Sequence, residues 1–156
     1  MRIAMTRSPI VTSALDMIAT ATLTVRTQGE GFSDITGEVA GFLRESGGVI
    51  GAVHLFVRHT SASLTIQENA DPDVRADLLT ALRRLAPKDG GWVHDTEGPD
   101  DMPAHIKTML TSTGLRIPVT GGRLALGTWQ GIYLIEHRAQ PHRREIVMQF
   151  CGTASQ

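Results

Sequence analysis

The sequence predicts an α+β protein with one domain, in which a mixed, largely antiparallel sheet packs with about three helices. Two observations support this class. Stretches in which apolar and polar residues alternate, as in half-buried strands, outnumber stretches with the apolar spacing of a helix. The strand-like stretches of the second half follow one another across short turns with glycine or proline, which favours antiparallel pairing. A chain of 156 residues is long enough for one sizeable core.

The first part of the chain is predicted to contain a leader, a strand and a short helix. Residues 1–14 show no clear apolar period, and we expect a loose leader ahead of a single domain at 15–156. Residues 18–26 alternate apolar side chains with threonines, which predicts a half-buried strand. A short helix follows, with Thr36 as its N-cap and Gly47 at its end.

The middle of the chain is predicted to contain a central strand and the clearest helix. Residues 49–57 have apolar side chains on both faces, which is typical of a strand inside a sheet, and one of these faces continues to His59. A short strand is expected at 64–67. Asp71 is a good N-cap for the helix that follows, with Pro72 at the first helical position. The apolar stripe of this helix consists of Val74, Leu78, Leu82 and Leu85.

The second half is predicted to contain a further helix and four strands. Asp101 and the proline two residues later resemble a helix start, and Gly114 ends this helix. The expected buried face of this helix consists of Ile106, Met109 and Leu110. A tight hairpin is expected at Gly121 and Gly122, and a turn at Pro141. The expected strands cover 115–119, 123–126, 132–136 and 145–151.

The charge balance and the cysteine content exclude several classes of protein. Because 15 basic residues nearly cancel 16 acidic ones, the chain has no global positive field that would attract nucleic acid. No apolar stretch is long enough to span a bilayer, and the start of the chain does not resemble a signal peptide. Cys151 is the only cysteine, which suits a reducing cytosol. We therefore expect a cytoplasmic protein without nucleic-acid or membrane partners.

The stretch 90–105 carries the densest titratable chemistry in the chain. His94 and His105 bracket four acidic residues, which are Asp95, Glu97, Asp100 and Asp101. Together with His59, the two histidines could supply three ligands to a transition metal such as Zn²⁺, whereas the carboxylates could hold Mg²⁺. His59 could instead act as a general acid or base. The alternative is a hydrogen-bonded acidic turn, in which Asp101 caps a helix and the histidines are incidental.

Two further clusters lie at the ends of predicted strands. Residues 58–61, Arg-His-Thr-Ser, follow the central strand, and residues 127–131, Gly-Thr-Trp-Gln-Gly, precede another strand. The second cluster could stack a planar ring on Trp129 and hydrogen-bond its edge, or it could be a hydrophobic plug with glycine bends. Arg138 and Arg144 suit phosphate oxygens, and cross-strand salt bridges are the alternative.

Three ordered motifs resemble one known family. They are HTSASLTIQENADPDVRADL at 59–78, His94 with DMPAHIK at 101–107, and LGTWQGIYLIEHR at 126–138 followed by PHRR at 141–144. Between Met17 and Gly152 the chain is similar to the YjbQ-like family, whose members are called secondary thiamine-phosphate synthases. One departure is Gln67, where many relatives have asparagine.

The resemblance implies a compact α+β fold, a homotrimer, and a polar or metal-binding centre at His59, His94 and His105. From the ligand types we expect a divalent metal ion, Zn or Mg, there. The resemblance also implies an activity. The chain would join hydroxymethylpyrimidine diphosphate to thiazole phosphate, releasing pyrophosphate and forming thiamine phosphate, as a side activity beside an open physiological substrate.

On this basis we expect a transferase that acts on a phosphorylated small molecule, with the three clusters converging on one site. The expected catalytic residues are His59, Glu68 and Glu136. The expected substrate-binding residues are Thr60, Ser61, Asn69, Trp129, Gln130, Arg138 and Arg144. Two alternatives use the same residues: a non-catalytic trimer that binds a metal or small ligand, and a metal-dependent hydrolase of phosphate or acyl esters.

Overall fold

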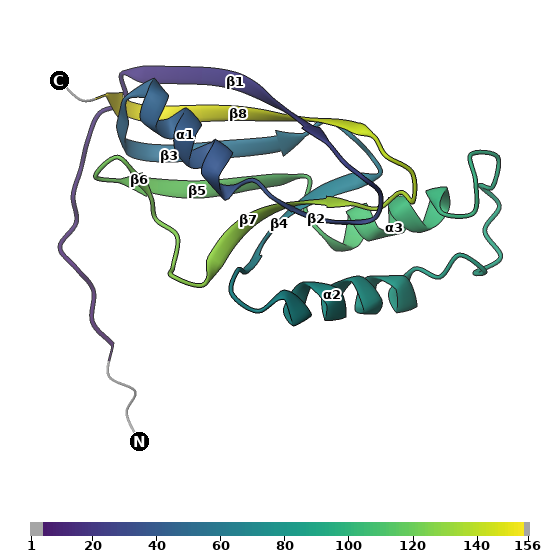
Figure 1. Cartoon of the computed structure of the whole chain (residues 1–156). Helices are drawn as coiled ribbons and strands as arrows, with labels where there is room; N and C mark the ends of the chain where they lie inside the picture. The colour runs from purple at the N-terminus through teal and green to yellow at the C-terminus, as the bar shows by residue number, and fades with distance from the viewer. Residues whose placement is uncertain (1–4, 155–156) are drawn as a thin grey trace.

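Two antiparallel sheets and three helices make up the computed structural model, which describes residues 5–154 (Figure 1). The strands are β1 (Met17–Arg26), β2 (Gly31–Asp34), β3 (Gly48–Val57), β4 (Ala62–Glu68), β5 (Gly114–Thr120), β6 (Arg123–Leu124), β7 (Gln130–Glu136) and β8 (Arg143–Ala154). The helices are α1 (Thr36–Ser46), α2 (Pro72–Leu85) and α3 (Asp101–Leu110). Residues 5–16 contain no helix or strand, and residues 1–4 of the expected leader lie outside the described part of the chain. None of the described helices is long and apolar enough to cross a membrane.

The sheet topology confirms the predicted α+β class. One sheet has the strand order β1-β8-β3-β5-β6, the other has the order β2-β7-β4, and the paired strands are antiparallel. Because β7 and β8 belong to different sheets, the turn expected at Pro141 joins two sheets and does not close a hairpin. The hairpin between β5 and β6 lies at Gly121 and Gly122 as predicted, where φ angles of 57° and 73° favour glycine.

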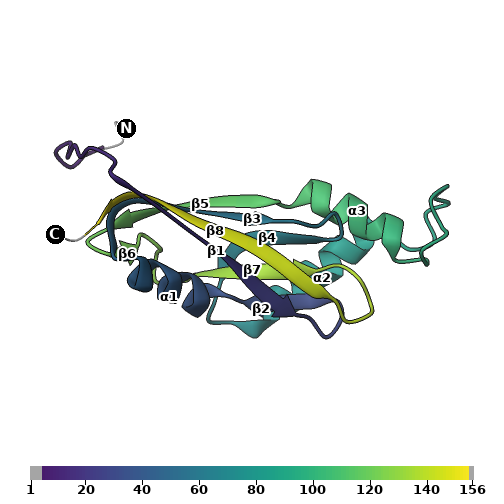
Figure 2. The same ribbon diagram turned by 90° about the horizontal axis from the view of Figure 1, so that it is seen from above.

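The main core lies where α1 packs against one face of the five-stranded sheet (Figures 1 and 2). β3 has β8 and β5 as neighbours, as its apolar sequence predicts, and Val53, Leu55 and Val57 are buried. α1 adds Val39 and Leu43 to the same core. Full burial of each such side chain contributes about 1.5–3 kcal/mol to folding. This core therefore fixes the direction of β3, whose end leads into the cluster at 58–61.

The start of α1 differs from the prediction. Its N-cap position is Ile35, and Thr36 is the first helical residue. The Thr36 hydroxyl accepts a hydrogen bond from the main-chain N–H of Ile132 at 2.8 Å, and the Asp34 carboxylate accepts one from the Thr36 N–H at 2.9 Å. Thr36 therefore ties the helix to β7 instead of capping it. Gly47 ends α1 in the left-handed conformation, as predicted.

α2 begins as its sequence predicts but lies at the edge of the molecule. The Asp71 side chain caps it by accepting a hydrogen bond from the Asp73 N–H at 2.9 Å. None of the residues of α2 is fully buried, and Leu85, the last member of its apolar stripe, is exposed. α2 lies beside α3 in both views of the molecule (Figures 1 and 2).

The buried face of α3 is not the one expected. Met109 and Leu110 are 88% and 54% exposed, whereas Asp101 and Lys107 are 2% and 4% exposed. The prediction was therefore wrong for Met109 and Leu110, whereas Ile106 is partly buried and Pro103 and Ala104 supply the buried apolar side chains. The physical reason is that both buried charges have partners of opposite charge, which offset the cost of removing them from water. α3 thus buries charged groups, and one of them, Asp101, belongs to the candidate site.

Candidate metal centre

Asp101 is the centre of a compact cluster that includes both histidines of the acidic stretch. Its Oδ2 accepts a hydrogen bond from His94 Nε2 at 2.7 Å and lies 3.3 Å from His105 Nε2. The two imidazole centroids are 5.5 Å apart. One ligand atom from each of the three residues lies within 4.8 Å of the others. The described chain therefore brings two nitrogens and one carboxylate oxygen together.

Local structure accounts for this arrangement. Asp101 and His105 are four residues apart on α3, so their side chains lie on the same face of the helix. His94 comes from the loop between α2 and α3, which folds back onto the start of α3. Gly98 supports this reversal with a φ of 106°, which side-chain-bearing residues rarely adopt, and its N–H donates to the Asp95 carbonyl.

Arg138 holds the loop and Asp101 in place. Its Nη2 donates to the Glu97 carbonyl at 2.7 Å, its Nε pairs with Asp100 Oδ2 at 3.2 Å, and its Nη1 pairs with Asp101 Oδ1. One Asp101 oxygen is thereby fixed, which leaves Oδ2 for the histidines. Burial raises the pKa of Asp101, but the hydrogen bond from His94 and the Arg138 charge outweigh this and hold the pKa below its usual value.

A main-chain carbonyl sets the tautomer of His105. Its Nδ1 lies 2.9 Å from the Thr60 carbonyl oxygen, which can only accept, so Nδ1 carries the proton. In neutral His105 the Nε2 lone pair then faces the Asp101 oxygen across 3.3 Å. Two electron-rich atoms at this distance are stabilised by a cation or a proton between them. This is the arrangement that outer-shell partners give to metal-binding histidines.

The donor set fits a transition metal better than Mg²⁺. Two imidazoles and one carboxylate are ligands of zinc and of non-haem iron, and such sites keep further positions open. Mg²⁺ prefers several oxygen ligands, but the Asp100 carboxylate is used by Arg138 and by the Ala139 N–H, at 2.8 Å. Glu97 contacts Arg138 through its main chain. Zn²⁺ is thus the better match of the two metals expected.

His59 lies outside this group in the single chain. Together with Thr60, Ser61 and Arg144 it lines a separate, open pocket of about 610 Å³. Its Nε2 accepts a hydrogen bond from the Glu145 N–H at 2.8 Å, so the proton of the neutral ring is on Nδ1. Burial, and next the Arg144 charge, lower its pKa and favour this neutral form. Within the described residues, Asp101 takes the third position that we expected for His59.

Glu136 and Arg144 form a buried ion pair, although we expected a catalytic acid and a phosphate ligand. Arg144 Nε donates to Glu136 Oε2 at 2.7 Å, and its Nη2 donates to the Ser61 carbonyl and hydroxyl. The second Glu136 oxygen accepts from the Arg138 N–H at 3.0 Å. Burial raises the pKa of Glu136, but the hydrogen bond from Arg144 outweighs it and the pKa is lowered. In the single chain, this pair therefore positions the segment that carries His59.

The cluster at 127–131 lies far from the metal centre. β4 and β7 pair Ala62 with Glu136 at one end and Glu68 with Gln130 at the other. Six residues of strand separate the two ends by about 20 Å. The expected convergence of all three clusters is therefore not found within one chain. Trp129, at the distant end, is 63% exposed.

The other residues expected at the distant end hold its turns together. Asn69 Nδ2 donates to the Thr128 carbonyl at 3.3 Å, and Glu68 Oε2 accepts from the Asp71 N–H at 2.9 Å. Gln130 Oε1 accepts from the Gly127 N–H at 2.8 Å. These contacts order the exposed loop around Trp129.

The family of the chain follows from comparison with known proteins. A family model described as UPF0047 protein YjbQ-like matches residues 21–153. The chain belongs to this family. A UPF0047 protein of Synechocystis is 50% identical over 131 residues, which cover 83% of this chain and 89% of the relative. The UPF0047 protein YjbQ of Escherichia coli is 46% identical over 132 residues, covering 84% and 96%. The resemblance based on three motifs is thus confirmed.

Solved structures share the UPF0047 fold. A crystal structure of a protein from Aeropyrum pernix aligns with a TM-score of 0.80 at 32% identity, over 86% of this chain and 99% of that one. A second, from Clostridium acetobutylicum and assigned to the YjbQ/UPF0047 family, aligns with a TM-score of 0.78 at 39% identity, over 83% and 98%.

Three contributors to the site in this UPF0047 chain were missed or misjudged from the sequence. We did not single out Asp101 among the four acidic residues as the partner of both histidines, although its spacing of four from His105 is a usable signal. Arg138 positions the loop instead of meeting substrate in the single chain. Thr60 reaches the centre through its carbonyl, and residue type gives no signal for that.

Proposed function

We propose that this UPF0047 protein is an enzyme that acts on a phosphorylated small molecule, with a divalent transition metal bound by His94, Asp101 and His105. The observation that carries the proposal is the convergence of both Nε2 atoms on Asp101 Oδ2, with the His105 tautomer fixed by Thr60. In its specific form, the reaction joins hydroxymethylpyrimidine diphosphate to thiazole phosphate and yields thiamine phosphate.

Each residue has a distinct task in this proposal. A bound metal would supply positive charge to offset that of a leaving diphosphate. His59 would donate its Nδ1–H to a phosphate oxygen in the open pocket, since its Nε2 is already used. Ser61 and Thr60 line the same pocket. Because Thr60 also bonds His105, the pocket and the metal centre share one segment of chain.

A homotrimer would supply what the single chain lacks. Trp129 and Gln130 lie at the end of β7 opposite Glu136, so they can reach a metal centre only in another chain. We therefore propose that the stacking wall for a heteroaromatic substrate comes from a neighbouring subunit. The same arrangement accounts for the large exposed area of Trp129.

A metal-dependent hydrolase of phosphate or acyl esters is the second candidate. The observation that favours it is the exposure of the His94 side chain, which is 44% accessible and leaves the centre open to water. A synthase excludes water from a reactive diphosphate, whereas a hydrolase needs access for it. A centre that remains open after assembly would favour hydrolysis.

The test measures metal binding and product formation in the same preparations. Purified protein is loaded with Zn²⁺, and metal content is determined after dialysis. Thiamine phosphate and pyrophosphate are then measured with both substrates present. We expect one metal per chain and product formation in the unaltered protein. His105→Ala should lower metal affinity by more than the roughly 10–100-fold typical of an outer-shell change. His54→Ala, on β3 and outside the centre, should leave both unchanged.

The outcomes separate the candidates. Metal binding with release of phosphate or carboxylate from simple esters, but without thiamine phosphate, would replace the synthase by the hydrolase. Metal binding without turnover of any of these substrates would indicate a binding protein. Equal metal content in the unaltered protein and in His105→Ala would contradict the proposed metal centre.

A further inference from the structure

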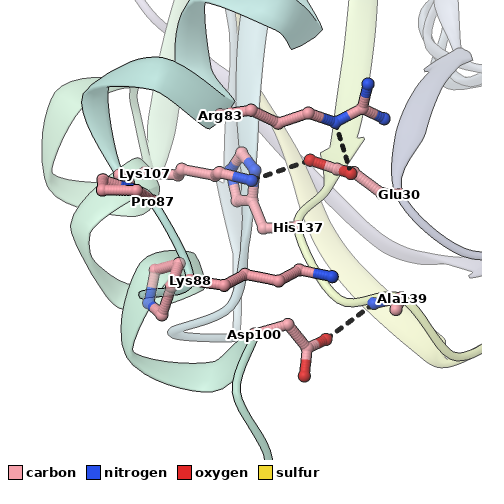
Figure 3. Close-up of a pocket in the computed structure, with 10 residues that line it drawn as sticks. Glu30, Arg83, Pro87, Lys88, Asp100, Lys107, His137 and Ala139 are labelled. Atoms are coloured by element: carbon pink, nitrogen blue, oxygen red, sulfur yellow. Dashed lines mark hydrogen bonds and ion pairs between the residues drawn. The ribbon is translucent and has the colours of Figure 1, made fainter. Parts of the chain in front are cut away.

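A second cavity lies on the opposite side of α3 from the metal centre. It measures about 260 Å³ and is enclosed by the end of α2, by α3, by the β1–β2 loop and by the segment after β7 (Figure 3). Pro103 and Lys107 line it from α3, whereas Asp101 and His105 of the same helix form the metal centre. The remaining lining residues are Glu30, Arg83, Ala86, Pro87, Lys88, Asp100, His137 and Ala139. The helix therefore separates two sites of different chemistry.

Cations outnumber available carboxylates in this cavity. Glu30 pairs with two cations at once, Lys107 Nζ at 2.7 Å and Arg83 Nε at 3.0 Å (Figure 3). Asp100 is already bound to Arg138 and to a main-chain N–H. The ammonium of Lys107, buried at 4% exposure, has three donors and gives one to Glu30. The cavity thus has an excess of positive charge and of donors.

Proton counting assigns the free nitrogen of His137. The Thr111 hydroxyl lies 2.7 Å from two acceptors, the Lys107 carbonyl and Ser63 Oγ, and Ser63 Oγ lies 2.8 Å from His137 Nε2. The carbonyl can only accept, so it takes the single Thr111 proton, and Ser63 then donates to Thr111 Oγ1. Two hydroxyls supply only two protons, so the third must come from His137 Nε2. Nδ1 of the neutral ring then carries a lone pair.

That lone pair has no partner among the described residues. Nδ1 of His137 is the buried side-chain atom without a hydrogen bond, in a residue that is 2% exposed. Nε2 points to Ser63 and Thr111, which do not line the cavity, whereas His137 itself does. An unpaired buried acceptor is costly, and a ligand that donates a hydrogen bond would relieve the cost.

We propose that this cavity binds a small oxyanion that also carries a hydroxyl proton, of which monohydrogen phosphate is the simplest. Lys107, Arg83 and Lys88 meet its negative oxygens, and its hydroxyl donates to His137 Nδ1. The volume lies just below the range of pockets for drug-sized ligands, so a nucleotide does not fit. The site does not depend on the metal centre or on the proposed reaction.

Sulfate is the matched probe for the role of His137. At about pH 8 it has the size and charge of monohydrogen phosphate but no proton to donate. Binding of each anion is followed by the shifts of main-chain amides around the cavity, together with the side-chain nitrogen signals of His137. We expect an unprotonated Nδ1 in the free protein and saturable binding of phosphate. Sulfate should bind roughly fivefold more weakly, which corresponds to one hydrogen bond.

Three variants assign the effects to particular groups. Lys88→Ala changes an exposed side chain that the fold does not need, and it should weaken phosphate and sulfate alike. His137→Phe keeps a ring and removes both nitrogens, so the two anions should bind equally. His94→Ala alters the metal centre alone and should leave both affinities unchanged. Glycerol phosphate, compared with phosphate, tells whether the natural ligand is the free ion or a small ester.

The proposal fails if neither anion shifts the signals around the cavity. It also fails if Lys88→Ala binds both anions as tightly as the unaltered protein, or if sulfate matches phosphate while His137 is present. A proton on Nδ1 in the free protein would overturn the assigned role of His137, and this measurement needs no variant.

Discussion

At the scale of single residues, one hydrogen bond decides what each histidine can do. His105 gives its Nδ1 proton to a carbonyl and keeps Nε2 as a ligand atom. His59 accepts a main-chain N–H at Nε2 and keeps a donor at Nδ1. His137 donates from Nε2 and keeps an acceptor at Nδ1. Three side chains with the same chemistry are therefore suited to metal binding, to donation and to acceptance, because their partners differ.

His137 also makes stability depend on pH. Burial, and next the charge of Lys107, lower its pKa from 6.5 to about 4, although Glu136 and Glu30 act in the opposite direction. Below pH 6.5 the unfolded chain binds a proton that the folded chain does not, so stability falls with falling pH until about pH 4. The full effect is about 3 kcal/mol of unfolding free energy. Urea unfolding at several pH values between 6.5 and 4 measures this loss of unfolding free energy.

Replacing the ring isolates its contribution from that of other titrating groups. Between pH 6.5 and about pH 4, the unfolding free energy of His137→Phe should depend less on pH than that of the unaltered protein. Across this range the two proteins should differ by about 3 kcal/mol in how much stability they lose. His142→Phe, the same substitution at a partly buried histidine, is the control for the change of residue type. Parallel curves for the unaltered protein and His137→Phe would contradict the lowered pKa.

At the scale of elements, α3 shows how far sequence patterns reach. Asp101 and the proline two residues later predicted its start well, because helix starts have local sequence signals, but the helix ends at Leu110 and the expected stop, Gly114, begins β5. Its buried face was predicted wrongly, because apolar spacing ignores partners that lie far away in sequence. Lys107 is buried only because Glu30, from the β1–β2 loop, lies beside it. No local pattern encodes that pairing.

The ion pair between Lys107 and Glu30 tests which face of α3 is buried. Lys107→Ala removes one of two cations from Glu30, and we expect a loss of about 2–3 kcal/mol of unfolding free energy, since Arg83 still pairs with the carboxylate. Met109→Ala, at an exposed position of the same helix, should change it by less than about 0.5 kcal/mol. Chemical denaturation measures both. If Met109→Ala proved the more damaging change, the helix would have the opposite face buried.

At the scale of the whole molecule, the fold class was predictable and the arrangement of sheets was not. Alternation in β1 and the apolar run of β3 reveal strands, but they do not say which strands pair. β7 pairs with β2 and β4, and β8 with β1 and β3, so the predicted turn at Pro141 connects two sheets. In the candidate site, too, the sequence identified residues but not how they are arranged. Residue types identified His94 and His105, whereas register places Trp129 about 20 Å along β7 from Glu136.

In an oligomer, Trp129 of one chain can lie beside the metal centre of another chain, although the two are far apart within one chain. Oligomers that mix two variants test this. A cyclic trimer, with three times the 16.9 kDa chain mass, would place the Trp129 end of one chain beside the metal centre of the next. Chains with His105→Ala or Trp129→Ala should each be inactive in the assay for thiamine phosphate. In an equal mixture, about a quarter of the sites combine an intact centre with an intact neighbouring Trp129. Activity should return to about that fraction.

The matched control combines two defects of the same centre. His94 and His105 belong to one chain in the cluster around Asp101, so mixing His94→Ala with His105→Ala leaves every site with at least one defect and restores nothing. Light scattering on each mixture verifies the trimer, and co-purification of the untagged variant with a tagged one verifies the exchange of chains. If the mixture with Trp129→Ala stayed inactive in exchanged trimers, the stacking wall would not come from a neighbour. Because Trp129 cannot reach the centre of its own chain, it would then have no part in the site at all.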